Sequence, residues 1–343
     1  MERDRAETKP GRMYWGAISL VPIGLGVVIG LIFLVMNNYQ YSQAAAKPAP
    51  KPAPIDGERA YGYLKTICAI GPRIAGSAAN TRQRELVKAH FEKCGATVRD
   101  EAFTASHPRD GTPVPMVNLV GSWNPDRSER VLIAAHYDTR PYPDQDPNPA
   151  KRRDPFIGAN DGASGTALLM ELANHLKDWP TPWGVDLVLL DGEELVYQDG
   201  DEYFLGSKEF GRAYKERRAR DPQSPRYVAG IVLDMIGDRN LQIAREPNSV
   251  ELAPALVRDV WGVAASLRSR VFVNDFGRRV LDDHLPLNEA GIPTIDIIDF
   301  DYPRWHTTGD VPEACSGASL AQVGRVLTSW LAVPKPAPRT RRR

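Results

Sequence analysis

An apolar run that ends abruptly in acidic residues constrains the fold of this 343-residue chain more than any other feature. Residues 185–190 read Val-Asp-Leu-Val-Leu-Leu, and Asp-Gly-Glu-Glu follows directly at 191–194. Apolar residues bounded by a turn signal are typical of a buried strand, and open α/β sheets bind ligands beyond the carboxyl ends of such strands. Consecutive side chains point different ways, so Glu193 and Glu194 could divide metal binding and proton transfer between them. An ordinary solvated acidic turn is the alternative that this motif alone leaves open.

Further apolar runs alternate with helical patterns over residues 55–333. Besides the run at 185–190, strands are predicted at 116–120, 131–135, 228–233, 271–273 and 293–298. Helices are predicted at 55–69, 80–94, 163–176, 206–217, 252–267 and 319–331. This alternation predicts one α/β domain with a central mixed, mostly parallel sheet flanked by helices. The loop at 140–157 is rich in proline and aspartate, and loops of that length are usually functional or mobile.

The first 36 residues contain a candidate membrane helix. Residues 17–36 carry no charge and reach the roughly 20 residues that a spanning helix needs. Four basic residues precede this segment, which favours a cytoplasmic segment at 1–16 and a transmembrane signal anchor at 17–36. The rest of the chain would then lie outside the cytoplasm, in the periplasm or the extracellular space. Secretion after cleavage at the small residues 44–46 is the runner-up.

The segments on either side of the predicted α/β domain, residues 55–333, have a low-complexity composition. Residues 37–54 are rich in alanine, proline and lysine and predict a semi-rigid linker, and residues 334–343 predict a basic disordered tail. The net charge of zero indicates no nucleic-acid partner. Three cysteines are too few for a disulfide framework, and pairing of Cys68 with Cys94 stays open.

Several other residues that could do chemistry follow predicted strands or begin helices. They are His136, Asp161, Asp234, Asp282 and His306. Each alone has an ordinary explanation as a helix cap, turn acid or surface imidazole. Strand ends of one sheet converge on one edge, however, and this mixture of nitrogen and oxygen donors suits Zn²⁺ in an open catalytic site. A glutamate beside a ligating glutamate is well placed as a general base.

The order of these motifs resembles a known family. This is the zinc aminopeptidase family, whose members have a phosphorylase/hydrolase-like α/β fold. The motifs that carry the resemblance lie at 136–138, 158–165, 191–194, 234 and 306–307. Within that family, Asp-Asp-His at 282–284 and Trp-His-Thr at 305–307 resemble the glutaminyl-peptide cyclotransferase (glutaminyl cyclase) branch, bacterial type. The resemblance implies zinc chemistry on the N-termini of peptides or proteins.

The cyclase resemblance implies that an N-terminal glutamine is converted to pyroglutamate with release of ammonia. It implies three ligands for one zinc ion: Asp161, Glu194 and His306. Glu193 would take a proton from the attacking α-amine and deliver it to the departing ammonia, while Asp234 and Asp282 tune it. Trp305 and Tyr302 are the predicted aromatic residues of the substrate pocket.

Two alternatives remain beside the cyclase. The aminopeptidase branch implies two zinc ions, with His136 and Asp234 completing the second site and Glu193 activating a water molecule. A non-catalytic binding domain is the third hypothesis. The chain departs from the animal cyclases, which carry a histidine where Asp296 stands and a tryptophan that residues 197–201 lack.

Overall fold

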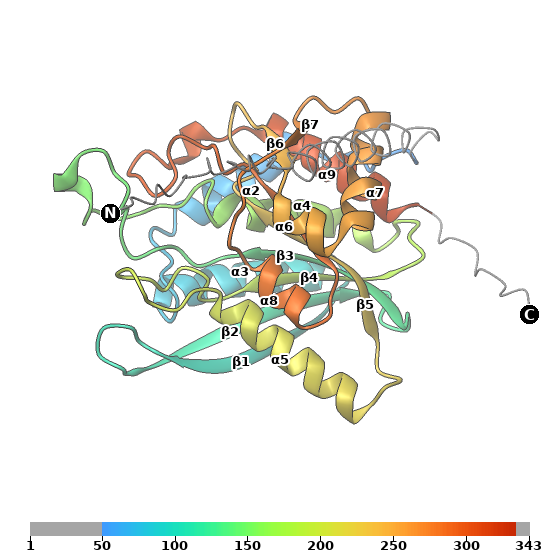
Figure 1. Cartoon of the computed structure of the whole chain (residues 1–343), viewed down its shortest axis with the longest axis horizontal. Coiled ribbons are helices and arrows are strands. Elements are labelled where there is room, and N and C mark those ends of the chain that lie inside the picture. The colour runs from blue at the N-terminus through green and yellow to red at the C-terminus, as the bar shows by residue number, and fades with distance from the viewer. Residues whose placement is uncertain (1–49, 334–343) are drawn as a thin grey trace, which may run out of the picture. The chain divides into compact units, whose positions relative to one another are not determined.

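The computed structural model describes residues 50–333, which fold as one α/β domain around a mixed sheet (Figure 1). The six strands, in the order β1-β2-β4-β3-β5-β8, are β1 (Thr97–Ser106), β2 (Pro113–Trp123), β4 (Gly184–Leu190), β3 (Glu129–His136), β5 (Arg226–Asp234) and β8 (Thr294–Ile298). β2 pairs antiparallel with β1 and β4, whereas the other three pairings are parallel. The predicted α/β class with a mixed central sheet is confirmed.

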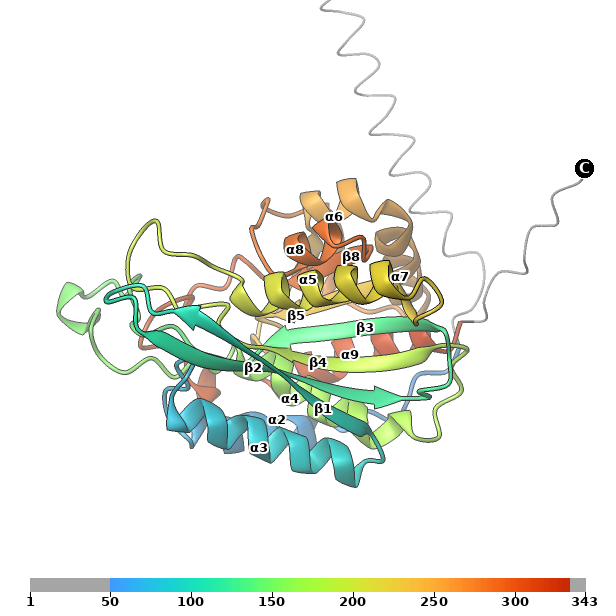
Figure 2. The same ribbon diagram turned by 90° about the horizontal axis from the view of Figure 1, so that it is seen from below.

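Helices cover both faces of this sheet, as Figure 2 shows. One face carries α2 (Gly57–Cys68), α3 (Ala78–Lys93), α4 (Ala163–Leu176) and α9 (Gly317–Leu331). The other face carries α5 (Leu205–Arg220) and α8 (His284–Glu289). The helices α6 (Pro247–Leu252) and α7 (Pro254–Ser266) contact β8, and η2 (Pro149–Lys151) and η3 (Pro312–Ala314) are short 3₁₀ turns.

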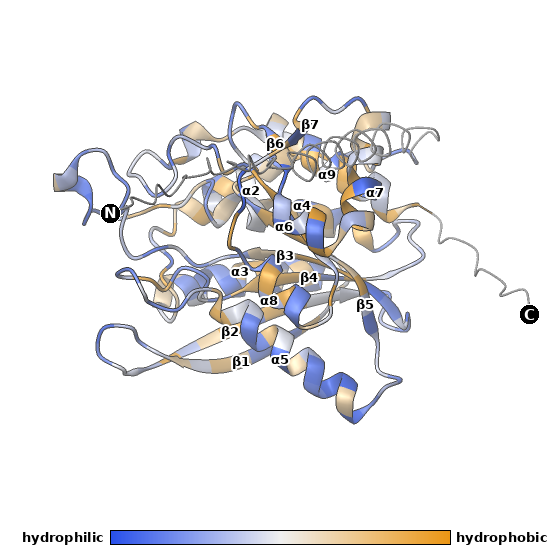
Figure 3. Cartoon of the chain, in the orientation of Figure 1, coloured by the Kyte–Doolittle hydropathy of each residue, from blue (hydrophilic) through white to orange (hydrophobic). Residues whose placement is uncertain are grey.

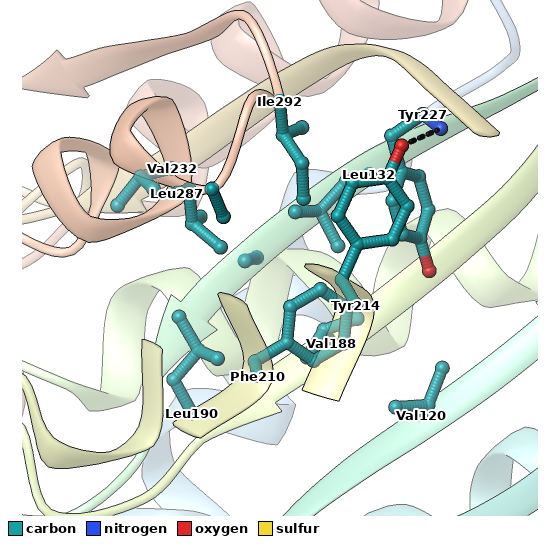
Figure 4. Close-up of a cluster of buried hydrophobic side chains, with 12 residues drawn as sticks. Val120, Leu132, Val188, Leu190, Phe210, Tyr214, Tyr227, Val232, Leu287 and Ile292 are labelled. Carbon is teal, nitrogen blue, oxygen red and sulfur yellow. Dashed lines mark hydrogen bonds between the residues drawn. The ribbon is translucent and has the colours of Figure 1, made fainter. Parts of the chain in front are cut away.

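Apolar packing between α5, α8 and the central strands makes one part of the core. Every residue of β4 is buried, as expected for a strand covered on both faces. Figure 4 shows Phe210 and Tyr214 of α5 beside Tyr227 of β5, with ring centroids 5.9 Å and 5.3 Å from the Tyr227 ring. The inward side of α5 is therefore apolar, while much of the helix is hydrophilic in Figure 3.

Two elements in the second half of the domain differ from the sequence expectations. The helix expected at 252–267 is α7, which begins at Pro254, and the short helix α6 before it was not predicted. Pro254 has no amide hydrogen, and Ala253 between the two helices is not helical, with φ −135° and ψ 54°. The strand expected at 271–273 is β7 (Phe272–Phe276), which pairs with β6 (Ile243–Arg245) in a separate two-stranded sheet.

The N-terminal and C-terminal predictions fall outside the described residues. These are the cytoplasmic segment 1–16, the membrane anchor 17–36, most of the linker 37–54 and the basic tail 334–343. Within residues 50–333, no helix combines the length and apolar character that crossing a bilayer requires. In the same part of the chain Cys68, Cys94 and Cys315 are all free thiols, so the disulfide left open above does not form.

A buried carboxylate ties α2 to α4 and supplies a test of the fold. The side chain of Glu171 is inaccessible to solvent and accepts hydrogen bonds from Arg59 Nε at 2.7 Å, His175 Nε2 at 3.0 Å and the Asp56 amide at 2.9 Å. Burial alone would raise the pKa of Glu171, but the bonds from His175 and Arg59 outweigh it and lower the pKa to about 2. Glu171 therefore stabilises the fold in its charged form.

We expect Glu171→Gln to lower the free energy of unfolding at pH 7 by about 2 kcal/mol, the scale of charge-assisted hydrogen bonds. Because the native pKa lies below the unfolded value of about 4.3, this contribution is present above that value and is lost as the pH falls toward 2. Urea unfolding from pH 7 to pH 2.5 should show the gap between the proteins closing. Glu58→Gln, on the exposed side of α2, is the control. A gap that stays constant with pH would contradict this role.

Candidate metal centre

Three neighbouring strands deliver polar side chains to one edge of the sheet. His136 is the last residue of β3, Asp234 is the last residue of β5, and Glu193 and Glu194 follow β4 after a turn at Gly192. The strands β4, β3 and β5 are parallel neighbours, so their carboxyl ends meet. Gly192 has φ +70°, a conformation that glycine adopts without strain, and this turn redirects the chain at the end of β4.

One cluster of donors consists of Asp161, Glu194 and His306. One ligand atom from each lies within 4.8 Å of the others, and all three residues are buried. His306 Nε2 lies 2.8 Å from Glu194 Oε1 and 3.5 Å from Asp161 Oδ2. These are the three residues that the sequence predicted as ligands of a single zinc ion.

A second cluster shares Asp161 with the first. His136 Nε2 lies 3.3 Å from Asp161 Oδ1 and 3.3 Å from Asp234 Oδ1, and one ligand atom of each residue lies within 4.8 Å of the others. Asp161 therefore offers its two oxygens to two histidines on opposite sides. The structure brings all five predicted ligand residues together at one centre.

The donor set fits zinc. Asp161 Oδ2 is buried without a hydrogen-bond partner, although it points toward His306. A buried carboxylate oxygen without a partner is costly unless a cation or proton compensates it. Three protein ligands of the imidazole and carboxylate kind are also typical of a catalytic zinc site with an open coordination position.

Close packing around two glycines places Asp161 over the sheet edge. A Cβ atom at Gly165 would lie 2.4 Å from the Leu233 carbonyl oxygen and 2.7 Å from the Ala135 Cβ, so the first turn of α4 sits directly on β3 and β5. Gly162 has φ +87°, and a Cβ there would meet the Asp138 carbonyl at 2.8 Å. The glycine-rich segment that the sequence marked is thus needed for the close approach of Asp161 to His136.

The two adjacent glutamates lie in one hydrogen-bonded turn, and their side chains point to different neighbours. Asp138 accepts the amide hydrogens of Glu193 and Glu194 at 3.1 Å and 3.0 Å, which fixes the turn while the side chains diverge. Glu194 lies against His306, whereas Glu193 Oε2 lies 3.8 Å from His136 Nδ1. The side chain of Glu193 is 12% exposed, compared with 4% for Glu194, so Glu193 is the one open to a substrate.

The two glutamates also differ in acidity. Burial, and then the charge of Glu194, raises the pKa of Glu193 well above its usual range. Burial also opposes ionisation of Glu194, but His306 and Arg140 outweigh it and lower the pKa of that carboxyl. This asymmetry matches a proton carrier beside a charged metal ligand.

Further buried acids surround Glu193. Burial raises the pKa of Asp234 to about 7, with the charges of Asp161 and Asp282 adding to it. Asp282 is 4% exposed and groups with His284 and Asp296. Burial, and then the charge of Asp282, raises the pKa of Asp296 well above its usual range.

The two predicted pocket aromatics have different environments. Trp305 is half-buried and stacks on the His306 ring, with centroids 3.9 Å apart and an interplanar angle of 26°. Tyr302 is only 4% exposed, and its hydroxyl donates to Asp310 Oδ1 at 2.8 Å. Asp310 in turn accepts the amide hydrogen of Asp161 at 3.1 Å. Tyr302 therefore supports the Asp161 turn, and Trp305 is the one of the two that is open to a substrate.

Sequence reasoning missed several residues that hold the ligands in place. Asp138 and Asp310 bind backbone amides of the ligand turns, and Asp144 contacts His306 Nδ1 at 3.1 Å. Asp138 lies in the His-Tyr-Asp motif, so its position carried a signal. Asp144 and Asp310 lie in loops of acidic composition, where nothing in the pattern separates them from solvated aspartates.

Taken together, the fold and the clusters define a candidate zinc centre of the aminopeptidase-like kind. The family model described as Peptidase family M28 matches residues 118–331. The chain belongs to peptidase family M28. The resemblance to this zinc aminopeptidase family that the sequence motifs indicated is thereby confirmed.

The individual relatives include glutaminyl cyclases and an aminopeptidase. The chain is 25% identical over 309 residues to a glutaminyl-peptide cyclotransferase-like protein of Mus musculus, covering 81% of this chain and 76% of that protein. It matches the crystal structure of Fimbriiglobus ruber glutaminyl cyclase with a TM-score of 0.81 and 42% identity, covering 84% of this chain and 98% of the other. A leucine aminopeptidase precursor from Bacteroides thetaiotaomicron matches with a TM-score of 0.75 and 30% identity, covering 83% and 100%.

Proposed function

We propose that this protein is a zinc-dependent glutaminyl-peptide cyclotransferase, which converts an N-terminal glutamine to pyroglutamate and releases ammonia. The observation that carries the proposal is the 42% identity to Fimbriiglobus ruber glutaminyl cyclase over nearly its whole length. The site agrees with it, because Glu193 has a raised pKa beside a complete set of zinc donors. The neighbouring acids Asp234 and Asp282 and the stacked Trp305 are also in place.

Asp161, Glu194 and His306 would hold the zinc ion. When bound, it would polarise the side-chain amide carbonyl of the glutamine as a Lewis acid. Glu193 takes a proton from the α-amine as the amine nitrogen forms its bond to the amide carbon. Glu193 then delivers that proton to the amide nitrogen, whose bond to carbon breaks as ammonia leaves. The α-amine and the side-chain amide belong to the same glutamine, so the reaction is intramolecular. The ring face of Trp305 contributes by holding these two groups in a reactive geometry.

The second cluster motivates the competing function of a two-zinc aminopeptidase. His136, Asp161 and Asp234 are within reach of one ion, so the ligand set for a second zinc is complete. Metal analysis of protein repurified in excess zinc distinguishes the two functions. We expect close to one zinc per chain. Two tightly bound ions together with release of N-terminal residues from a peptide panel would favour the aminopeptidase.

The proposed activity is tested by ammonia release from a Gln-Phe peptide. The matched control is the same peptide with its amine acetylated, because the blocked nitrogen cannot attack the side chain. We expect ammonia from the free peptide only, and none from either peptide after zinc is removed with a chelator. Equal ammonia release from both peptides would indicate amide hydrolysis and contradict cyclisation.

We also propose that residues 17–36 anchor the protein in a membrane, with residues 55–333 outside the cytoplasm. The support is the uncharged length of the segment and the basic residues before it. Cell fractionation should place the full chain with membranes, and deletion of residues 17–36 should release it. A processed chain that begins near residue 47 would instead support cleaved secretion.

A further inference from the structure

The loop at 140–157 is fastened to the turn that carries His306. The Gln145 amide donates to the His306 carbonyl oxygen at 3.1 Å. Asp146 Oδ2 accepts from both the amide and the hydroxyl of Thr308, at 2.9 Å and 2.6 Å. The Phe156 ring lies edge-on to the His306 imidazole, with centroids 6.1 Å apart. The loop therefore contacts the backbone and the ring of one candidate zinc ligand.

Asp144 is the residue of this loop that reaches the imidazole. Its Oδ1 lies 3.1 Å from His306 Nδ1, while the opposite ring nitrogen, Nε2, faces Glu194 and Asp161. Arg140 holds the same carboxylate from the other side, with Nε 2.7 Å from Oδ1 and Nη2 3.2 Å from Oδ2. The carboxylate is thereby fixed between a guanidinium and the imidazole.

Arg140 also links this arrangement to a second ligand. Its amide donates to Glu194 Oε2 at 3.0 Å, and its Nη1 lies 3.8 Å from Glu194 Oε1. His306 itself has φ +52°, a left-handed conformation that costs a non-glycine residue energy and persists only when surrounding contacts impose it. The contacts from Asp144 and Gln145 are therefore part of what keeps the imidazole at the centre.

We propose that Asp144 is a positioning residue that keeps the proton of His306 on Nδ1 and leaves Nε2 free to bind zinc. A metal-bound imidazole commonly donates its other N–H to a carboxylate, which fixes the tautomer and orientation of the ring and strengthens it as a ligand. Arg140 forms an ion pair with Asp144, with Nε 2.7 Å from Oδ1, and so holds the carboxylate against the imidazole. The inference rests on the proposed zinc ligand His306 and extends the proposed function.

The first test measures zinc affinity with a competing chelator in the full-length protein. We expect Asp144→Ala to weaken zinc binding by roughly 10- to 100-fold, the range seen when partners of metal ligands are removed. Asp144→Asn should be affected less, since its amide oxygen can also accept a hydrogen from Nδ1. Asp154→Ala, an exposed aspartate in the same loop, is the matched control. Unchanged affinity in Asp144→Ala, or an equal loss in Asp154→Ala, would overturn the proposal.

The second test needs no variant and stands even if Asp144→Ala fails to fold. Long-range proton–nitrogen spectra of the zinc-loaded wild type, labelled at histidine nitrogens, report which nitrogen of His306 carries the proton. We expect a metal-bound Nε2 and a protonated Nδ1 whose proton signal is shifted downfield by the carboxylate of Asp144. An Nδ1 proton without that shift, or a metal-bound Nδ1, would overturn the proposal. Both tests read zinc binding and not turnover. A protein that binds zinc in this way but does not cyclise glutamine would therefore contradict only the proposed function.

Discussion

Glu193→Gln is expected to lower turnover of an N-terminal glutamine peptide by roughly 100- to 10,000-fold, the usual contribution of a general acid–base group. The amide keeps the shape of the side chain but can no longer take a proton from the α-amine. The raised pKa of Glu193 in its buried position is the property that the substitution removes. Steady-state kinetics, with zinc content measured on the same samples, provides the test.

Zinc content should be unchanged in Glu193→Gln, because the three predicted ligands Asp161, Glu194 and His306 are all retained. The control is Glu202→Gln, an exposed glutamate further along the same segment, which should retain full turnover. Full activity in Glu193→Gln would contradict its role as proton carrier. Activity and zinc lost together would reassign Glu193 to metal binding.

Asp161→Ala is expected to abolish zinc binding and reduce turnover by about 1,000-fold or more. The reason is that a metal ion acting as a Lewis acid stabilises the transition state by several kcal/mol. Asp161 is the one residue shared by both clusters, with one oxygen facing His136 and the other facing His306. Its replacement therefore removes a ligand whether the protein holds one zinc ion or two.

Atomic-emission analysis after dialysis, together with the peptide assay, checks this prediction. Asp199→Ala, an exposed aspartate between Glu194 and α5, should keep both zinc and activity. The metal-free wild type is the second reference, and Asp161→Ala should match its residual activity. An Asp161→Ala protein that retains a full zinc ion would place the metal outside the clusters described above.

The parallel strands and the candidate site residues at their ends could be predicted because one physical rule governs both, whereas the assignment of particular zinc ligands rested on the family resemblance. Buried parallel strands appear in sequence as uninterrupted apolar runs, and the polar residue after each run must lie at the shared edge of the sheet. His136, Asp234 and the Glu193–Glu194 pair were all found in this way. Asp161 was found through its glycines, which the structure shows are needed for close packing.

Elements without such a pattern escaped prediction. β1 lies at the edge of the sheet and has no buried residue, so charged residues such as Arg99 and Glu101 interrupt its apolar positions. Asp144 and Asp310 act through contacts with residues far along the chain, which only the folded structure reveals. Tyr302 was predicted as a pocket residue together with Trp305, but the structure buries it and its hydroxyl donates to Asp310.

Product analysis in water enriched in the heavy oxygen isotope tests the central claim most directly. The full-length protein is given a peptide that begins with glutamine, and the products are identified by mass, with Glu193→Gln as the background for spontaneous cyclisation. We predict a pyroglutamyl peptide that has lost ammonia and carries no heavy oxygen, because no water attacks. Free glutamine with heavy oxygen in its carboxyl group would contradict the proposal and identify a hydrolytic aminopeptidase.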